Sequence, residues 1–215
     1  MNQYARKSQL GFSLMELMIS VTLGLIISAA LISLFINSKK SYLINENLSR
    51  LQENGRFAVS FLSRDLRMAD YRACVTDDRL DNAISGQNDT GLNGSDTVTI
   101  VWRSNDCGAA SSTVTTVYSI QTGTNGGPAL FRSVDGVSRE LVEGIENLQV
   151  LYGEDTDGDN VPNYYVDAAS VADMKKAISV RFTLTARTLE ENMTVGGNRI
   201  SRAFASAVTL RNRLP

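Results

Sequence analysis

The sequence predicts an α+β fold: a long N-terminal α-helix, transmembrane in its first half and amphipathic in its second, packed on an antiparallel β-sheet. Two observations lead to this prediction. An uncharged apolar run near the N-terminus is followed by apolar residues at helical spacing up to about residue 70. Beyond that point the period changes to two, which is typical of strands with one buried face.

The N-terminal segment joins a basic head to an apolar rod. Residues 1–10 carry Arg6 and Lys7, whereas residues 17–36 contain neither a charge nor a proline. A helix of about twenty residues is roughly 30 Å long and can cross a bilayer. A secretory signal would have a shorter apolar region ending in a small-residue cleavage site, which does not fit here. Because positive charge favours the cytoplasm, we expect the chain after about Lys39 to be extracytoplasmic.

Glu16 is an acid within this apolar segment, where a carboxylate costs about 2–3 kcal/mol at bilayer depth unless it is paired. It belongs to the run GFSLMEL, residues 11–17, which resembles the class III signal of type IV pilins and pseudopilins. The resemblance implies that a prepilin peptidase cuts between Gly11 and Phe12 and that the new N-terminal amine of Phe12 is methylated. It also implies that Glu16 is the assembly acid, which meets the Phe12 amine of a neighbouring subunit. The alternative is a plain signal anchor that happens to contain Glu16.

The resemblance divides the chain into three parts. It implies that residues 1–11 are a leader peptide, that 12–36 form the transmembrane and filament-core helix, and that 37–215 form an extracytoplasmic pilin-like domain. That domain includes the C-terminal half of the helix. Major pilins commonly carry a proline two-thirds of the way along the rod, and its absence from residues 28–34 favours a minor component.

The second half of the helix is identified by its apolar stripe, which we expect to face the core. The stripe members recur at steps of three and four: Ile44, Leu48, Leu51, Gly55, Ala58, Leu62, Leu66 and Ala69. One helix from Phe12 to about Asp70 is the simplest interpretation. Its many arginines are interspersed with acids, so they indicate a solvated helix face in preference to a polyanion-binding patch.

Strands are expected around residues 98–102, 114–120, 148–152, 178–186 and 204–210. The clearest is 178–186, where Ile178, Val180, Phe182, Leu184 and Ala186 should point inward and the residues between them outward. Stretches rich in Gly, Ser, Asn, Asp and Thr predict surface loops at 85–96, 104–112 and 122–128. The segments LVEGIENLQVLYGEDTDGD, VRFTLTAR and VTLRNR are similar to the closing part of the PilW group of minor pilins.

Cys74 and Cys107 are the only cysteines. An even number of cysteines in an oxidising compartment predicts a disulfide between them. Two free thiols remain the alternative, because spacing alone does not place the two residues within bonding distance. A metal site built on two cysteines without histidine is a weaker alternative.

Asp155, Asp157 and Asp159 place three carboxylates at alternate positions around Gly158. Ca²⁺ accepts oxygen ligands from alternate positions of such loops, and the candidate ligands are Asp155, Asp157, Asp159, the Val161 carbonyl, Asn163 and Asp167. The loop departs from an EF-hand, because its glycine stands at position four and Val166 at position twelve. The alternative is a solvated acidic turn.

The composition argues against catalysis and against nucleic-acid binding. The chain has no histidine and a net charge of −2, so it lacks the commonest general base and any overall basic field for nucleic acid. No nucleophile lies in a recognisable catalytic motif, and three acids within five residues are too close to flank a substrate. We therefore expect no enzymatic activity and no nucleic-acid partner.

The leading hypothesis is a minor pilin of a type IV pilus that initiates filament assembly, in a minor-pilin complex at the tip. Family membership implies, as partners, other minor pilins, the major pilin, the prepilin peptidase, the inner-membrane assembly platform and a tip adhesin. The protein would be a single-pass inner-membrane protein with a cytoplasmic N-terminus and a periplasm-facing domain, and it would reach the cell surface with the pilus. The alternatives are a minor pseudopilin of a type II secretion system and a DNA-binding minor pilin of a competence system.

Overall fold

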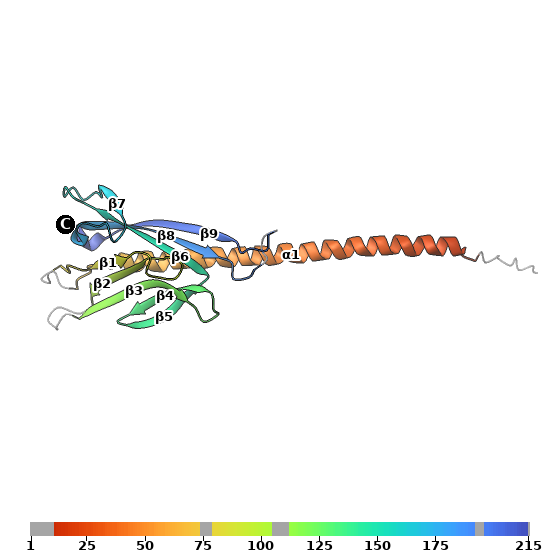
Figure 1. Ribbon diagram of the computed structural model, residues 1–215, viewed down its shortest axis with the longest axis horizontal. Helices are drawn as coiled ribbons and strands as arrows, with labels where there is room; N and C mark the ends of the chain where they lie inside the picture. The colour runs from red at the N-terminus through yellow and green to blue at the C-terminus, as the bar shows by residue number, and fades with distance from the viewer. Residues whose placement is uncertain (1–10, 74–78, 105–111, 192–195, 215) are drawn as a thin grey trace, which may run out of the picture. The chain divides into compact units, whose positions relative to one another are not determined.

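A computed structural model describes residues 11–73, 79–104, 112–191 and 196–214 (Figure 1). Its first element is helix α1, Leu14–Leu66, which confirms the predicted long helix with slightly closer ends. The chain divides into two compact units, one up to Glu46 and one from Asn47 on, and α1 contributes residues to both. The second unit holds all of the strands.

The turn that follows α1 is held by the C-terminal segment of the chain. After Leu66 the backbone turns, and Asp70 adopts a left-handed conformation with φ 59°. The Asn212 side-chain amide donates to the carbonyl oxygens of Arg67 and Ala69, both at 3.0 Å. Two segments far apart in sequence are thereby joined.

The larger sheet, called sheet A, contains five antiparallel strands in sequence order. They are β1 Ile84–Gln87, β2 Thr97–Arg103, β3 Thr113–Thr122, β4 Pro128–Val134 and β5 Val137–Glu143. A two-residue turn connects β4 to β5, with positive φ at Asp135 (48°) and Gly136 (84°). This Asp-Gly pair has the backbone conformation that a tight hairpin requires.

The smaller sheet, called sheet B, is antiparallel with the order β7-β6-β8-β9. Its strands are β6 Ile145–Glu154, β7 Tyr164–Val166, β8 Ala177–Arg187 and β9 Ser201–Thr209, and short 3₁₀ helices cover Met174–Lys176 and Arg211–Arg213. The sequence predicted a single sheet, and the structure corrects this to two. Gly144 alone separates β5 from β6; its φ is +76°, and an added Cβ would lie 2.9 Å from the Arg187 carbonyl oxygen. Glycine at this position allows the chain to pass from one sheet to the other.

The core joins both sheets to the domain part of α1. In Figure 1, β7, β8 and β9 lie above this part of the helix and β3, β4 and β5 below it. Leu51, Ala58, Leu62 and Leu66 from the predicted stripe are buried in one cluster with side chains of both sheets. Burial of one such leucine contributes about 1.5–3 kcal/mol relative to leaving it exposed. The α+β class is thus confirmed, and the stripe is the reason the helix packs with this face.

Several strands were not anticipated. β1 begins at Ile84, which is fully buried, and its remaining three residues overlap the start of the predicted loop 85–96. β4, β5 and β7 had no predicted counterpart. On β8 the five predicted inward residues are buried, but Ser179, predicted to point outward, is also buried; its hydroxyl donates to the Tyr165 hydroxyl at 3.0 Å. Most of the predicted loop 104–112 lies outside the described residues.

Candidate functional site

The segment before α1 contains the predicted cleavage position. Gly11, Phe12 and Ser13 are not helical, and the first helical bond runs from the Leu17 N–H to the Ser13 carbonyl at 3.1 Å. A Cβ added to Gly11 would have no heavy atom of the described residues within 4 Å, and its φ is outside the left-handed region. Within the described residues, neither space nor backbone conformation explains a glycine here. This favours a requirement set by another molecule that approaches the Gly11–Phe12 bond.

Glu16 lies in the first turn of α1 and is exposed. The N-terminus of a helix carries partial positive charge, so a carboxylate is favourable there. Phe12, four residues earlier, is 81 % exposed. A free amine at Phe12 and the Glu16 carboxylate would be the only opposite charges at this end of the rod.

The rod that follows is built to lie in an apolar environment. Helix α1 is long and apolar enough to cross a membrane, and no residue of its most apolar window is buried within the protein. Hydroxyl groups of the rod bond the helix backbone in place of water: Ser20 donates to the Glu16 carbonyl at 2.7 Å and Ser33 to the Ala29 carbonyl at 3.0 Å. Satisfying polar groups inside the helix lowers the cost of placing them in hydrocarbon. The rod therefore needs lipid or neighbouring helices to cover it.

The acidic loop brings three of the predicted calcium ligands together. Oxygen atoms of Asp155, Asp157 and Asp159 lie within 4.8 Å of one another. Two backbone groups already donate to Asp155: Gly158 N–H at 2.6 Å and Asn160 N–H at 2.9 Å. Partial burial tends to raise the pKa of Asp155, but these N–H donors outweigh it and hold the pKa below its usual range. The loop thus holds charged carboxylates close together, and a cation would relieve their repulsion.

The other predicted ligands have different partners. Asn163 Oδ1 accepts from the Thr156 N–H at 2.7 Å, while its Nδ2 faces Asp157 at 3.2 Å. Asp167 lies outside the acidic group and accepts from the Ser170 N–H at 2.8 Å. The Val161 N–H donates to Asp159 Oδ1 at 2.8 Å. The three aspartates therefore fit part of a Ca²⁺ coordination shell, and the remaining oxygens would have to come from elsewhere, including water.

Cys74 and Cys107 lie outside the described residues. The chain segments that lead to them are nevertheless joined, because the Arg103 N–H donates to the Tyr71 carbonyl at 2.9 Å. Tyr71 precedes Cys74 by three positions and Arg103 precedes Cys107 by four. The predicted disulfide remains a prediction that this backbone contact favours.

One polar cluster was missed by sequence reasoning. Asp65 on α1 accepts from the Tyr118 hydroxyl and from Arg132 Nε, both at 2.7 Å through Oδ2. Tyr118 is fully buried, and burial followed by the negative charge of Asp65 raises the pKa of its hydroxyl. The signal was present, because Asp65 stands three residues after Leu62 on the apolar stripe, where a charge requires partners. This cluster joins the helix to sheet A.

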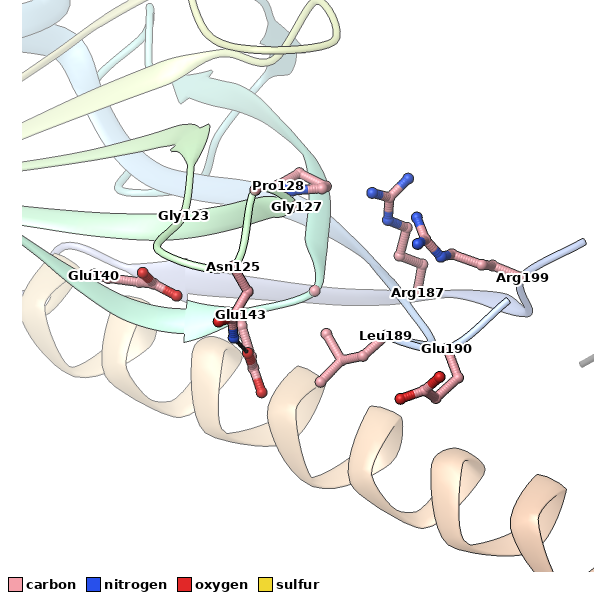
Figure 2. A pocket seen from close by; sticks show the side chains of 12 residues that line it. Gly123, Asn125, Gly127, Pro128, Glu140, Glu143, Arg187, Leu189, Glu190 and Arg199 are labelled. Atoms are coloured by element: carbon pink, nitrogen blue, oxygen red, sulfur yellow. Dashed lines mark hydrogen bonds between the residues drawn. The ribbon is translucent and has the colours of Figure 1, made fainter. Parts of the chain in front are cut away.

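A hollow of about 380 Å³ lies beside the β3–β4 turn and the end of β8 (Figure 2). Its charged groups are largely engaged: Arg187 pairs with Glu146 at 3.3 Å, and Asn125 donates to Glu143 at 2.9 Å. Among its described lining residues there is no hydroxyl, thiol or lysine side chain that could act as a nucleophile.

Comparisons with known proteins agree with this geometry. Residues 6–32 match the model of the prokaryotic N-terminal methylation motif, which covers the predicted cleavage position and most of the rod. Residues 117–212 match the family model described as type IV pilus-assembly protein W, which covers β3 to β9. A search of curated proteins finds no significant match. Together the two matches, which cover separate parts of the chain, support a type IV minor pilin, and its apolar N-terminal helix fits a membrane anchor.

Proposed function

We propose that this minor pilin acts in the initiation and assembly of the type IV pilus, within a minor-pilin complex at the filament tip. The observation that carries the proposal is the N-terminal segment: an open Gly11–Phe12 junction followed by Glu16 in the first turn of an exposed apolar rod. Each of these three features has a role in assembly and none in the packing of the domain.

The mechanism follows from the charges. Hydrolysis of the Gly11–Phe12 bond by the prepilin peptidase would release the leader and create an amine at Phe12. Within the membrane, this amine and the Glu16 carboxylate would each be costly, about 2–3 kcal/mol for the carboxylate. Contact between Glu16 of one subunit and Phe12 of the next would neutralise both charges. The pairing would thus favour incorporation over diffusion in the lipid.

The apolar rod supplies the second part of the mechanism. Leu17, Leu23 and Leu31 are more than half exposed, as are most large apolar side chains of this segment. In a filament the helices of neighbouring subunits would replace the lipid tails around them. Since lipid is as apolar as leucine, the gain would come from packing and from the paired charges. The partners would be other minor pilins and the major pilin, with a tip adhesin above them and the inner-membrane assembly platform below.

Glu16→Ala tests the proposal. The variant should insert and be cleaved normally, because removing an acid makes the rod more apolar. Its recovery in sheared surface filaments should fall roughly tenfold or more, as expected for a lost interaction of a few kcal/mol. Glu53→Ala, which removes an exposed acid from the domain part of the same helix, is the matched control and should be recovered like the parent. Equal recovery of Glu16→Ala and Glu53→Ala would reject the role of Glu16.

A further inference from the structure

The face of sheet A that packs against α1 is only partly covered by it. On β3 and β4 this face carries Tyr118 and Leu130, which are fully buried. Further along the same face Val134 pairs with Val137 across the β4–β5 hairpin, and Val137 is 58 % exposed. A hollow of about 430 Å³ lies over this end of the hairpin. The apolar face of the sheet therefore continues beyond the strip that α1 occupies.

One side of α1 is connected to this hollow through Asp65, which contacts the lining residue Arg132. Phe57, Phe61 and Arg64 lie at helical spacing on one side of the helix; the phenylalanine ring centroids are 4.4 Å apart, and the Arg64 guanidinium lies 4.7 Å from the Phe61 ring centroid. Arg64 contacts Asp65 at 3.4 Å, and Asp65 contacts Arg132, which lines the hollow. Phe57 is 44 % exposed. Asp65 thus links the aromatic side of the helix to Arg132 at the hollow.

We name this surface the β4–β5 groove and define it by six residues: Phe57, Phe61, Arg64, Val134, Val137 and Arg139. We propose that the β4–β5 groove receives the amphipathic helix of a different pilin subunit, one with carboxylates beside its apolar stripe. The proposal rests on the assembly function proposed above and identifies a surface through which this chain would contact its neighbour.

The dimensions of the groove favour a helix. Two neighbouring strands are about 4.8 Å apart, so the strip formed by β4 and β5 is close to the roughly 10 Å diameter of one helix. Helix α1 already contacts this face, because Asp65 bonds Tyr118 on β3 and Arg132 on β4. An extended partner strand would instead pair with the free edge of β5, because backbone hydrogen bonds of a sheet lie in its plane. A second helix beside α1 is the element that fits this face.

The charges on the rim select the partner. Arg139 is exposed and no ion pair of it occurs among the described residues, while the side chain of Arg64 is 64 % exposed. The one acid among the residues that line the hollow, Glu140, is already engaged, because its Oε2 accepts from the Thr124 N–H at 2.8 Å. The rim is therefore basic and complements carboxylates on an incoming helix.

A second copy of this chain is a poor occupant. From residue 47 to 67, the exposed charged residues of its own helical segment are Arg50, Arg56, Arg64 and Arg67 against Glu53. A helix with this excess of arginine would be repelled by Arg64 and Arg139. The charges therefore favour a subunit of different sequence.

The test uses the full-length protein in native membranes, with p-benzoylphenylalanine at position 137 as a photoactivated crosslinker. Position 138, the next residue on β5 and on the opposite face of the hairpin, is the matched control. Crosslinks from position 137 should map by mass spectrometry to the helical segment of another pilin subunit, at a residue next to Asp or Glu. Those from position 138 should not. Equal yields at the two positions, crosslinks to a non-helical segment, or crosslinks to a second copy of this chain would overturn the proposal.

A charge reversal supplies an independent readout. Arg139→Glu should reduce the crosslink yield from position 137 roughly three- to tenfold, because it places like charges together. Arg202→Glu, at an exposed arginine on β9 of sheet B, should leave the yield unchanged. Changing the crosslinked acid of the partner to lysine should restore the yield with Arg139→Glu, and absence of any restoration would count against the groove.

Failure of the groove and failure of the assembly function can be told apart. Cleavage at Gly11 and recovery in sheared filaments are measured on the same cells, while crosslinks are scored in the membrane fraction. Normal cleavage and recovery without a helical crosslink would refute the groove alone. A helical crosslink without recovery in filaments would support the groove and refute the assembly role.

Discussion

Replacing Asp65 with alanine should destabilise the globular domain strongly, because this carboxylate is the common partner of two groups on sheet A. The Tyr118 hydroxyl and the Arg132 guanidinium both reach Asp65 Oδ2 at 2.7 Å. Tyr118 is fully buried, and the side chains of Asp65 and Arg132 are 10 % and 29 % exposed. Without Asp65, a hydroxyl and a cation would remain without their acceptor.

The magnitude follows from this burial. A buried hydroxyl left without a partner costs about 1–3 kcal/mol. Breaking a buried ion pair costs about 3–5 kcal/mol, and the partial exposure of Arg132 lowers that figure because water can reach the guanidinium. We therefore expect Asp65→Ala to lower the free energy of unfolding by about 3 kcal/mol. In a domain of this size that corresponds to a Tm lower by roughly 6–12 °C.

Urea unfolding of the fragment 37–215, followed by circular dichroism, measures this change. Tyr118→Phe removes only the hydroxyl and should cost about 1.5–2 kcal/mol. Asp81→Ala is the control, because Asp81 pairs with Lys175 at 3.0 Å but both side chains are more than half exposed. Its effect should be within error of zero. If Asp65→Ala were no more destabilising than Asp81→Ala, the argument that burial makes this cluster important would be refuted.

Three further predictions concern pH, covalent structure and metal binding. Burial and the neighbouring carboxylates raise the pKa of Tyr118 and Tyr152 above the ordinary tyrosine value of about 10, so both stabilise the fold below that pH; the free energy of unfolding should fall as pH rises past 10, and less steeply in Tyr118→Phe. Urea titrations between pH 8 and 11.5 would show this, and a flat profile would contradict it. Cys74 and Cys107 should be joined by a disulfide worth roughly 3–4 kcal/mol for a loop of about 34 residues, and two alkylatable thiols in the unreduced protein would refute the bond. Millimolar Ca²⁺ should raise the Tm by about 3–5 °C if Kd is near 0.1 mM, whereas Mg²⁺ should not and Asp157→Ala should abolish the effect. Calorimetric titration without heat, together with an unchanged Tm, would identify the loop as an acidic turn.

The parts of the fold that depend on local pattern were predictable from the sequence. The stripe from Leu51 to Leu66 and the alternation from Ile178 to Ala186 each reflect one buried face, and the structure confirms both. The division into two sheets was not predictable in this way, because strand pairing brings together residues that are far apart in sequence. The Asp135-Gly136 pair did contain a hairpin signal for β4 and β5, since it lies between two short apolar runs.

The candidate site also contains residues that could be predicted from the sequence and contacts that could not. Gly11, Phe12 and Glu16 form a contiguous motif, so their identification required no tertiary structure. The partners of Asp65 could not be predicted, because Tyr118 and Arg132 lie more than fifty positions away. Similarly, Asp167 follows the acidic loop closely in sequence, yet its carboxylate caps the turn at Ser170.

The N-terminus of the mature protein tests the central claim most directly. Intact mass and N-terminal sequencing of protein from cells with an active prepilin peptidase should show a chain that begins at Phe12 with a methylated amine. Gly11→Ala should retain the leader, because its methyl group would crowd the approach of the peptidase to this bond. A mature form of the parent that still carries residues 1–11 would contradict the account of this chain as a processed, assembling pilin.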